Sequence, residues 1–566
     1  MPHFVTQLMR EQIQGPSMLR CIRILTISFL LTGAVAAQEI ADLPLPDKEE
    51  VWAAIDAHDY AAVEALFANT HLRQQKGEAD PDGTRWLFEI FGTNSPAVTD
   101  FTADWLEIYP ASPYANIAQA WVNHQTGWDI RGDKFARDIF PGALLEFAEL
   151  HEVAWQHAQK AYDADNNMRP ASDALIRLAN STGRKRQALK VLHEVMESDP
   201  NMGTLLRAVD MTIPGWGGSW KMAENLCGRY ARKIDWSQGD SVTYCKLYAF
   251  GHFHHHDEGL AWFKGKLMSG DYPDLEYLLM PWATRHTATR ADVEFARRFL
   301  NRDDVTRVDD AYDFDMNIAP VYDFEFVSPA HSRRAWDHAR EAIKRDPYNL
   351  YLIKALQRGV REVTRTETGI RWSNAEKLTR EEEVEFARRK LVASPYDSQH
   401  WRDYGRWLFP QSPDNLLKDE PYRINAIYFD NHRPGTLLTY AFEKWQLLSN
   451  LERLESDLKS EAFLSLSAEV QAKARADYAK WLAARERLDM DRDLNCPMMR
   501  AYRLYKFLCA ASAGKQCSDD SPQMIEMLEI VHADVSRRRA CQGVMVLDEM
   551  ELFYEPVEVD LGAPEG

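Results

Sequence analysis

The stretch EEEVEFARRKLVASPYDSQHWRDYGRWLF, Glu381 to Phe409, contains the pattern that decides the fold. Apolar residues recur every three or four positions before Pro395 and again after it, the spacing that places them on one face of a helix. Proline cannot continue a helix, and it biases the residue before it away from helical backbone angles. The stretch therefore predicts two amphipathic helices joined by a short turn at Pro395.

The same periodicity runs along most of the chain. It is found at residues 47–72, 142–165, 184–200 and 333–347. Helix–turn–helix units of this kind resemble tetratricopeptide repeats, whose units span about 34 residues, although Pro347 and Pro395 lie farther apart than that. The expected fold is mainly α, an irregular tetratricopeptide-like helical-repeat solenoid in two halves, because each helix pair buries its apolar stripe against the next pair.

A different pattern separates the two halves. In RVDDAYDFDMNIAPVYDFEFVSP, Arg307 to Pro329, aromatic and apolar residues alternate with acids, which is the period-two signature of extended chain. We expect a linker or small hairpin at residues 306–328, between an N-terminal helical domain at 47–305 and a C-terminal helical region at 329–566. The acids lack the ordered spacing and the glycine of a calcium-binding loop, so they predict a solvated face.

The N-terminus carries the pattern of an export signal. From Met18 the sequence reads MLRCIRILTISFLLTGAVAAQEI, with arginines first, then a short apolar core, then small residues ending at Ala37. This order is typical of a cleaved signal peptide, and the core is shorter than the roughly 20 residues of a membrane span. The sequence predicts a signal peptide at residues 1–37, a periplasmic or secreted bacterial protein, and no transmembrane anchor after cleavage.

Six cysteines follow the predicted cleavage site, and the compartments outside the cytosol are oxidising. Two of them form one group and four form a C-terminal group, which predicts one disulfide in the first group and two in the second. Four cysteines allow three pairings, so the connectivity of the second group stays open. No C-x-x-C motif occurs, so neither a zinc knuckle nor a thioredoxin-like site is indicated. The disulfide candidates are Cys227, Cys245, Cys496, Cys509, Cys517 and Cys541.

The charge of the chain restricts its partners. The 67 Lys and Arg residues are outnumbered by 86 Asp and Glu residues, which gives a formal net charge of -19. A protein that binds a phosphate backbone needs a clustered basic face, and no dense Lys/Arg block occurs in this sequence. We therefore expect no nucleic-acid partner.

The stretch IPGWGGSW, Ile213 to Trp220, is the strongest candidate for a functional loop. A phosphate-binding loop follows a strand and is completed by a lysine and a hydroxyl, but the sequence before Pro214 is helical in character and no such pair follows. Glycines permit the positive φ angles of a tight turn, and Ser219 can cap a helix that begins at Trp220. We interpret the stretch as a joint between helices, with both tryptophans packed in adjacent grooves. The residues of this joint are Gly215, Trp216, Gly217, Gly218, Ser219 and Trp220.

This turn, the helix HDYAAVEALF near the predicted mature start, and WLEIYPASPYANIAQAWVNHQTGWDIRGDKF between them resemble the bacterial domain of unknown function 4034 family. That family pairs a tryptophan-and-glycine turn with a Trp-x-x-Arg-Gly element, here Trp128, Arg131 and Gly132. The resemblance covers roughly residues 47–300 and implies a tetratricopeptide-like helical domain. It brings no assigned catalytic residue.

A run of histidines is the candidate metal site of the sequence. In GHFHHHDEG, His252, His255 and His256 share one helical face if the helix continues, and imidazoles so placed can bind zinc or copper. Histidine at the C-terminal end of a helix is also favoured by the helix dipole. Since metal sites usually draw ligands from more than one element, we expect no metal and no cofactor.

No motif of an enzyme class occurs in the sequence. We expect an exported helical-repeat protein that serves as an interaction scaffold for another protein or peptide, and not as an enzyme. The alternative is a cell-envelope enzyme that acts on carbohydrate through carboxylates presented by a helical scaffold. A deep cleft with paired, buried carboxylates would favour the enzyme, whereas an open groove would favour binding.

Overall fold

A computed structural model describes residues 45–566 with gaps. The gaps are 133, 237–238, 253–258, 284–287, 306–313, 315–326, 367–368, 411, 413–414, 416, 513–516, 518–520, 536–540, 542–551 and 562–566. The predicted signal peptide and nearly all of the predicted linker at 306–328 lie outside the described residues. The chain divides into residues 1–44 and one compact unit, Leu45–Gly566, which contains all the described residues.

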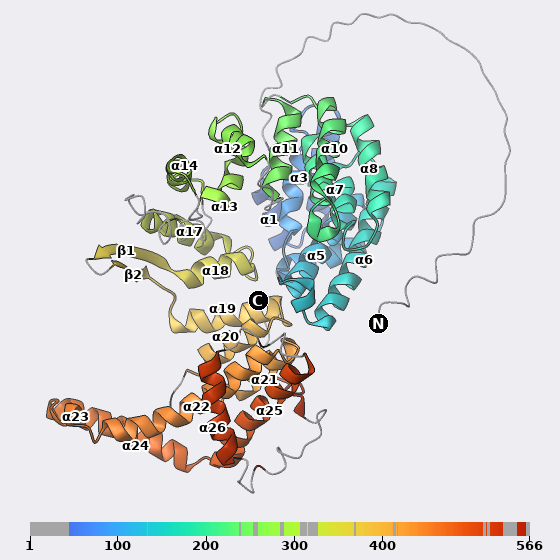
Figure 1. Cartoon of the computed structure of the whole chain (residues 1–566). Helices are drawn as coiled ribbons and strands as arrows, with labels where there is room; N and C mark the ends of the chain where they lie inside the picture. Colours follow the sequence, from blue (N-terminus) through green and yellow to red (C-terminus); the bar gives the residue numbers. More distant parts are fainter. Residues whose placement is uncertain are drawn as a thin grey trace, which may run out of the picture. The chain divides into compact units, whose positions relative to one another are not determined.

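The fold is mainly helical, as the sequence predicts. Helices account for 73% of the described residues and strands for 3%, so the helix content is well above the roughly one third of average globular proteins. Figure 1 shows helices following one another from residue 48 onward, with a single hairpin among them. No helix in the described part of the chain has both the length and the apolar character needed to cross a lipid bilayer.

The first eleven helices pack as successive neighbours. The long helices α5 and α6 pack against each other, and α7 in turn contacts α5, α6, α8 and α9. Caps and prolines set their ends, because Ser112 accepts hydrogen bonds from two amides of α5 and proline opens α4, α5 and α6. These helices are α1 (Lys48–Asp56), α2 (Tyr60–Gln75), α3 (Gly83–Phe88), α4 (Pro96–Ile108), α5 (Pro113–Arg131), α6 (Pro141–Ala164), α7 (Arg169–Leu178), α8 (Lys185–Ser198), α9 (Met202–Asp210), α10 (Trp220–Tyr230) and α11 (Ser241–His252).

One hydrophobic core holds this region together. It runs from Val51 to Val327 along the chain, and Trp105 lies at its N-terminal end among Phe67, Phe91 and Phe101. Trp105 is fully buried, and its indole N–H donates to Glu64 at 2.9 Å, so the one polar atom of the ring is satisfied. Each helix pair thus buries its apolar stripe on its neighbours.

The middle of the chain contains the only sheet among the described residues. Strands β1 (Val360–Thr366) and β2 (Gly369–Glu376) pair antiparallel, and α17 packs on β1. The sequence indicates a linker or small hairpin at 306–328 but not this hairpin, because the strands VREVTRT and GIRWSNAE carry few apolar residues. The helices around the hairpin are α12 (Leu260–Met268), α13 (Met280–Ala283), α14 (Arg290–Leu300), α17 (Ser328–Ala342) and α18 (Leu350–Arg358).

The C-terminal helices begin with the stretch that predicts the fold. Helix α19 ends at Ala393 and α20 begins at Ser398, and the indole N–H of Trp401 donates to the carbonyl of Pro395 at 2.6 Å across the turn. These helices are α19 (Arg380–Ala393), α20 (Ser398–Leu408), α21 (Glu420–Phe429), α22 (Pro434–Asp457), α23 (Glu461–Leu464), α24 (Ala468–Glu486), α25 (Cys496–Ala511) and α26 (Pro522–Val535). Short 3-10 segments lie at Glu89–Phe91, Ala136–Asp138, Pro214–Trp216, Ala231–Lys233 and Pro273–Leu279, and a π turn at Asp491–Asn495.

The six cysteines form three disulfides, one in the first group and two in the second. Cys227–Cys245 joins α10 to α11. Cys496–Cys541 and Cys509–Cys517 tie both ends of α25 to later parts of the chain. Cys227, Cys245 and Cys541 are fully buried in their core clusters, and three disulfides fit the oxidising compartment that the sequence predicts.

Candidate binding groove

Two positions of the turn Pro214–Ser219 require glycine, each for a different structural reason. Gly217 adopts a left-handed conformation with φ of 74°, and a side-chain carbon on Gly218 would lie 2.0 Å from the carbonyl oxygen of Thr212. The amides of Gly217 and Gly218 donate to the carbonyls of Pro214 and Ile213 at 2.8 and 3.2 Å. Because these amides are used within the turn, they cannot cradle a phosphate.

Ser219 and Trp220 begin the next helix at the predicted position. The Ser219 hydroxyl accepts from the amide of Met222 at 3.3 Å, so it caps α10. Trp220 packs edge-to-face on Phe250 with 5.7 Å between ring centroids. The turn is therefore a joint between α9 and α10.

The two elements that carry the family resemblance meet in space. The rings of Trp128 and Trp216 lie 5.9 Å apart, edge-to-face at 89°. The guanidinium of Arg131 lies 5.1 Å from the Trp128 ring, and it donates to the carbonyl of Gly132 at 2.7 Å. Gly132 ends α5 with a positive φ of 70°, which favours glycine. Arg131 and Gly132 thus fix the end of α5, while both tryptophans face a cavity.

That cavity lies between α5, α7 and α9. Its volume is about 310 Å³, and a second cavity of about 190 Å³ shares Gln125, Arg177 and Arg207 with it. We call the two cavities together the groove. Residues at i, i+3, i+4 and i+7 share one face of a helix, and α5 presents such a row. The groove is lined by Arg85, Phe88, Glu89, Gly92, Trp121, His124, Gln125, Trp128, Pro170, Asp173, Arg177, Asn180, Ser181, Arg207, Asp210, Met211, Ile213 and Trp216.

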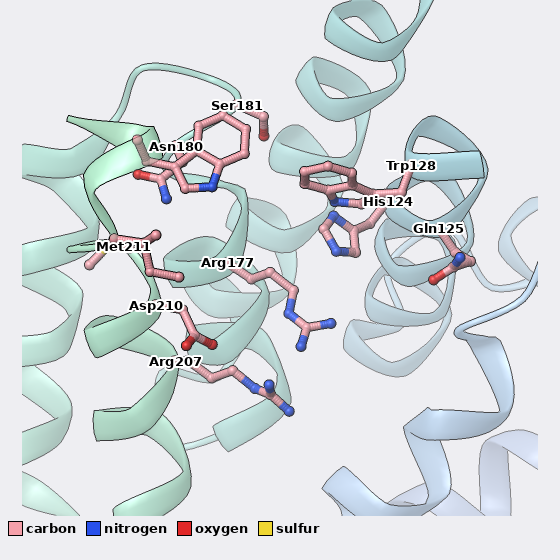
Figure 2. Close-up of a pocket in the computed structure, with 11 residues that line it drawn as sticks. His124, Gln125, Trp128, Arg177, Asn180, Ser181, Arg207, Asp210 and Met211 are labelled. Carbon is pink, nitrogen blue, oxygen red and sulfur yellow. The ribbon is translucent and has the colours of Figure 1, made fainter. Parts of the chain in front are cut away.

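Two arginines at the centre of the groove form no close ion pair among the described residues, although the charges of Asp210 and Asp173 act on Arg177. Figure 2 shows Arg177 and Arg207 extending toward the same space, which His124 and Trp128 border. Neither guanidinium forms a hydrogen bond or ion pair with any residue that the structure describes; Arg177 lies 4.9 Å from the ring of Trp121. Burial, reinforced by the charge of Arg207, lowers the pKa of Arg177 to about 10, so this side chain is still a cation at neutral pH.

A third arginine in the groove is different. Arg85 donates to the buried carboxylate of Asp173 at 2.6 Å, and to Asn201 and Thr204 at 3.3 and 3.2 Å. Asp173 also accepts from the Thr204 hydroxyl at 2.7 Å. Arg85 is therefore part of the framework of the groove, whereas Arg177 and Arg207 face its interior.

Several buried polar atoms of the groove lack partners. Among the described residues, Trp121 Nε1, His124 Nδ1 and Asn180 Oδ1 are enclosed without a hydrogen bond. His124 is only 6% exposed, and burial, followed by the charge of Arg177, lowers its pKa, so its ring is neutral at pH 7. A buried polar atom without a partner costs about 1–3 kcal/mol. Such atoms are a feature of binding sites, where a ligand supplies the partner.

The carboxylates of the groove are held by other side chains. Asp210 accepts from the hydroxyl of Tyr248 at 3.0 Å, and burial raises its pKa. Asp173 is paired with Arg85, as described above. Glu89, which lines the smaller cavity together with Asp173, is paired with Lys48 at 2.6 Å. All three carboxylates of the groove are therefore engaged by other side chains.

The predicted histidine site is only partly described. His252, the last residue of α11, lies against Tyr248 with 4.5 Å between ring centroids and the rings tilted by 52°, and its Nε2 is buried without a hydrogen bond. His255 and His256 lie outside the described residues. Among the residues that the structure covers, no three His, Cys, Asp or Glu side chains are grouped as a metal site. The metal hypothesis stays untested.

Arg177 and Arg207 are not among the site residues predicted from the sequence. Both lie in short apolar runs, DALIRLA and TLLRAVD, so each is a cation within the buried part of a helix. An arginine in such a run needs either an acidic partner or an opening to solvent. An arginine within each apolar run was therefore the sequence signal that could have pointed to these two site residues.

Comparison of the chain with protein-family models, curated proteins and solved structures found no match. The site is therefore interpreted from its own geometry.

Asp129, in the Trp-x-x-Arg-Gly element, has an unusual titration. It accepts from Gln125 at 2.9 Å, and burial, together with the charge of Asp346, raises its pKa to about 7. Because the folded-state pKa lies above the unfolded value of about 3.9, its contribution to stability is present in full below pH ~4 and is lost as the pH rises through 7.

We expect Asp129→Asn to stabilise the protein at pH 8 by about 1–2 kcal/mol, and this gain to shrink toward zero near pH 4. Three pKa units correspond to about 4 kcal/mol, and partial solvent access reduces that figure. The amide oxygen of asparagine can accept the same hydrogen bond from Gln125. Urea unfolding of both proteins at several pH values measures the difference. A difference that is the same at pH 4 and pH 8 would contradict the assignment.

Proposed function

We propose that the chain is an exported helical-repeat protein that serves as an interaction scaffold, and that another protein or peptide binds along the groove. Export is supported by the N-terminal sequence pattern and by three disulfides. The partner role is supported by the groove, because α3, α5, α7 and α9 all contribute side chains to it. A surface built from several successive helices suits an extended segment of a partner.

The single observation that carries the proposal is the pair of unpartnered arginines in a groove with aromatic walls. Tryptophan and arginine dominate the binding energy of many protein interfaces. Here Trp121, Trp128 and Trp216 line the same groove as Arg177 and Arg207. Three other arginines of this region, Arg85, Arg169 and Arg184, instead pair with carboxylates of the chain.

Membership of the domain of unknown function 4034 family stays a prediction. Its support is the sequence likeness and the meeting of Trp128 with Trp216, which brings the two elements of the likeness to one place. The enzyme alternative has less support. A glycosidase needs two carboxyl groups beside the scissile bond. The larger cavity has only Asp210 among its lining residues, and the two carboxylates of the smaller cavity, Glu89 and Asp173, are paired with Lys48 and Arg85.

The proposal is tested by photo-crosslinking in the native host. A benzophenone amino acid replaces Gln125 in the groove, or Leu145 on α6 in a control; Leu145 is 62% exposed and lies outside the groove. We expect a discrete adduct with one exported protein from the Gln125 derivative, and its absence from the Leu145 derivative. Identical adduct patterns, or none from Gln125, would count against a partner in the groove.

A further inference from the structure

Three features of the groove point to the chemistry of its ligand. The first is charge: Arg177 and Arg207 place two cations beside one space, and neither forms a hydrogen bond or close ion pair with the described residues. The carboxylate of Asp210 lines the same cavity and accepts from Tyr248, so the two arginines outnumber it there. Two cations that face each other repel, and an anion between them converts the repulsion into attraction. Guanidinium groups match carboxylates and phosphates because their N–H donors can form two parallel bonds to two oxygens.

The second feature is hydrogen-bonding capacity beside the cations. His124 lines the larger cavity, is more than nine-tenths buried, and has no partner at Nδ1. Trp121 Nε1 is a donor without a partner in the smaller cavity, which shares both arginines. An oxyanion accepts hydrogen bonds from such donors, so a ligand with several oxygens satisfies groups that the protein leaves unpaired.

The third feature is the apolar wall. Trp128 and Trp216 meet edge-to-face at the end of the larger cavity, and Met211 and Ile213 line it as well. A cavity of about 310 Å³ exceeds what a bare inorganic anion fills and is within the range of small-ligand sites. The wall therefore selects a ligand whose charged end is attached to a ring or another apolar body.

We infer that the groove is a binding site for an organic oxyanion, a carboxylate or phosphate carried by an aromatic or apolar group. The oxyanion lies between Arg177 and Arg207, and the apolar group lies against Trp128 and Trp216. The ligand is either a free small molecule or an acidic residue flanked by aromatic residues in a partner chain. The positive charge of the site is confined to the groove, because the chain as a whole has a net charge of -19. The groove therefore accepts a single anionic group, whereas the rest of the protein repels a polyanion.

The inference is tested by calorimetric titration of the mature, disulfide-bonded protein with benzoate, phenyl phosphate, inorganic phosphate and phenol. We expect the two aromatic anions to bind, inorganic phosphate to bind more weakly, and phenol not to bind. Arg177→Gln and Arg207→Gln should each weaken the binding of the aromatic anions about tenfold or more, since each substitution removes a charge-assisted hydrogen bond. Arg177→Lys keeps the positive charge but lacks the paired N–H donors of a guanidinium group, so it should give an intermediate affinity.

Lys190→Gln is the matched control, because it also removes one positive charge but from an exposed position on α8 outside the groove. It should bind like the wild type, and circular dichroism with thermal melts checks that every variant is folded. The inference is overturned if no anion binds, if phenol binds as well as benzoate, or if folded Gln variants bind like the wild type.

A second arm identifies the source of the anion. An end-blocked pentapeptide with glutamate between two phenylalanines is compared with its glutamine counterpart. Tighter binding of the glutamate peptide than of benzoate assigns the site to an acidic segment of a partner, and binding of the small anions alone assigns it to a free molecule. In the second case the oxyanion site stands while the scaffold proposal fails, so the two failures are distinguishable.

Discussion

Gly218→Val is expected to lower the free energy of unfolding by about 4 kcal/mol or more, or to prevent folding. A side-chain carbon at this position would lie 2.0 Å from the carbonyl oxygen and 2.2 Å from the carbonyl carbon of Thr212. Thr212 cannot yield, because it is 2% exposed and its amide donates to the carbonyl of Val209 at the end of α9. Relief would require moving α9 away from α10, and α9 carries Arg207 into the groove.

Gly215→Val is the control for this prediction. Gly215 belongs to the same turn, is exposed, and nothing lies within 4 Å of a carbon added to it. We expect a change within about 0.5 kcal/mol there, as for most surface substitutions. Gly217→Ala should fall between the two at about 1–2 kcal/mol, the cost of a left-handed conformation. Urea unfolding followed by circular dichroism ranks the three, and equal midpoints for the Gly215 and Gly218 variants would contradict the close approach.

Asp173→Ala is expected to cost about 3–5 kcal/mol, the usual effect of removing one partner from a buried ion pair. Its side chain is 3% exposed, accepts from Arg85 at 2.6 Å and from Thr204 at 2.7 Å, and joins α7 to α3 and α9. Removing the carboxylate leaves the charge of Arg85 with Asp82 alone, at the exposed edge of the cluster. The measurement is the unfolding free energy from urea titration.

Asp199→Ala serves as the comparison for Asp173→Ala. Asp199 accepts two hydrogen bonds from Arg169, at 2.6 and 2.8 Å, but its side chain is 41% exposed. Solvent screens that pair, so we expect a cost of about 1 kcal/mol. Equal losses of unfolding free energy for the two substitutions would mean that burial does not determine the strength of these ion pairs. The distinction between Arg85, as part of the framework, and the arginines that face the groove would then lose its physical basis.

The sequence predicted the helix ends correctly where a proline or a capping side chain marks them. Pro395 separates α19 from α20, and Ser219 caps α10, because proline and short hydroxyl side chains act on backbone groups within a few residues. The joint interpretation of Ile213–Trp220 follows from the same local chemistry. The family resemblance, export and the scaffold role depend on more than local chemistry, and they stay predictions.

The features that were not predicted from the sequence depend on contacts between residues far apart in the chain. Strands β1 and β2 lack a strong apolar alternation, so their pairing shows only in three dimensions. The disulfide Cys496–Cys541 spans 45 positions, and spacing alone left three connectivities open. Arg177 and Arg207 lie on different helices, and their meeting depends on the packing of α7 against α9.

The central claim is that Arg177 and Arg207 together hold an anionic group in the groove, and a crystal structure with 4-iodobenzoate tests it most directly. The anomalous signal of iodine locates the ring without ambiguity. The account predicts iodine beside Trp128 and Trp216, with carboxylate oxygens about 3 Å from nitrogens of both guanidinium groups. Iodine found only outside the groove, or Arg177 and Arg207 both ion-paired with carboxylates of the chain itself, would contradict it.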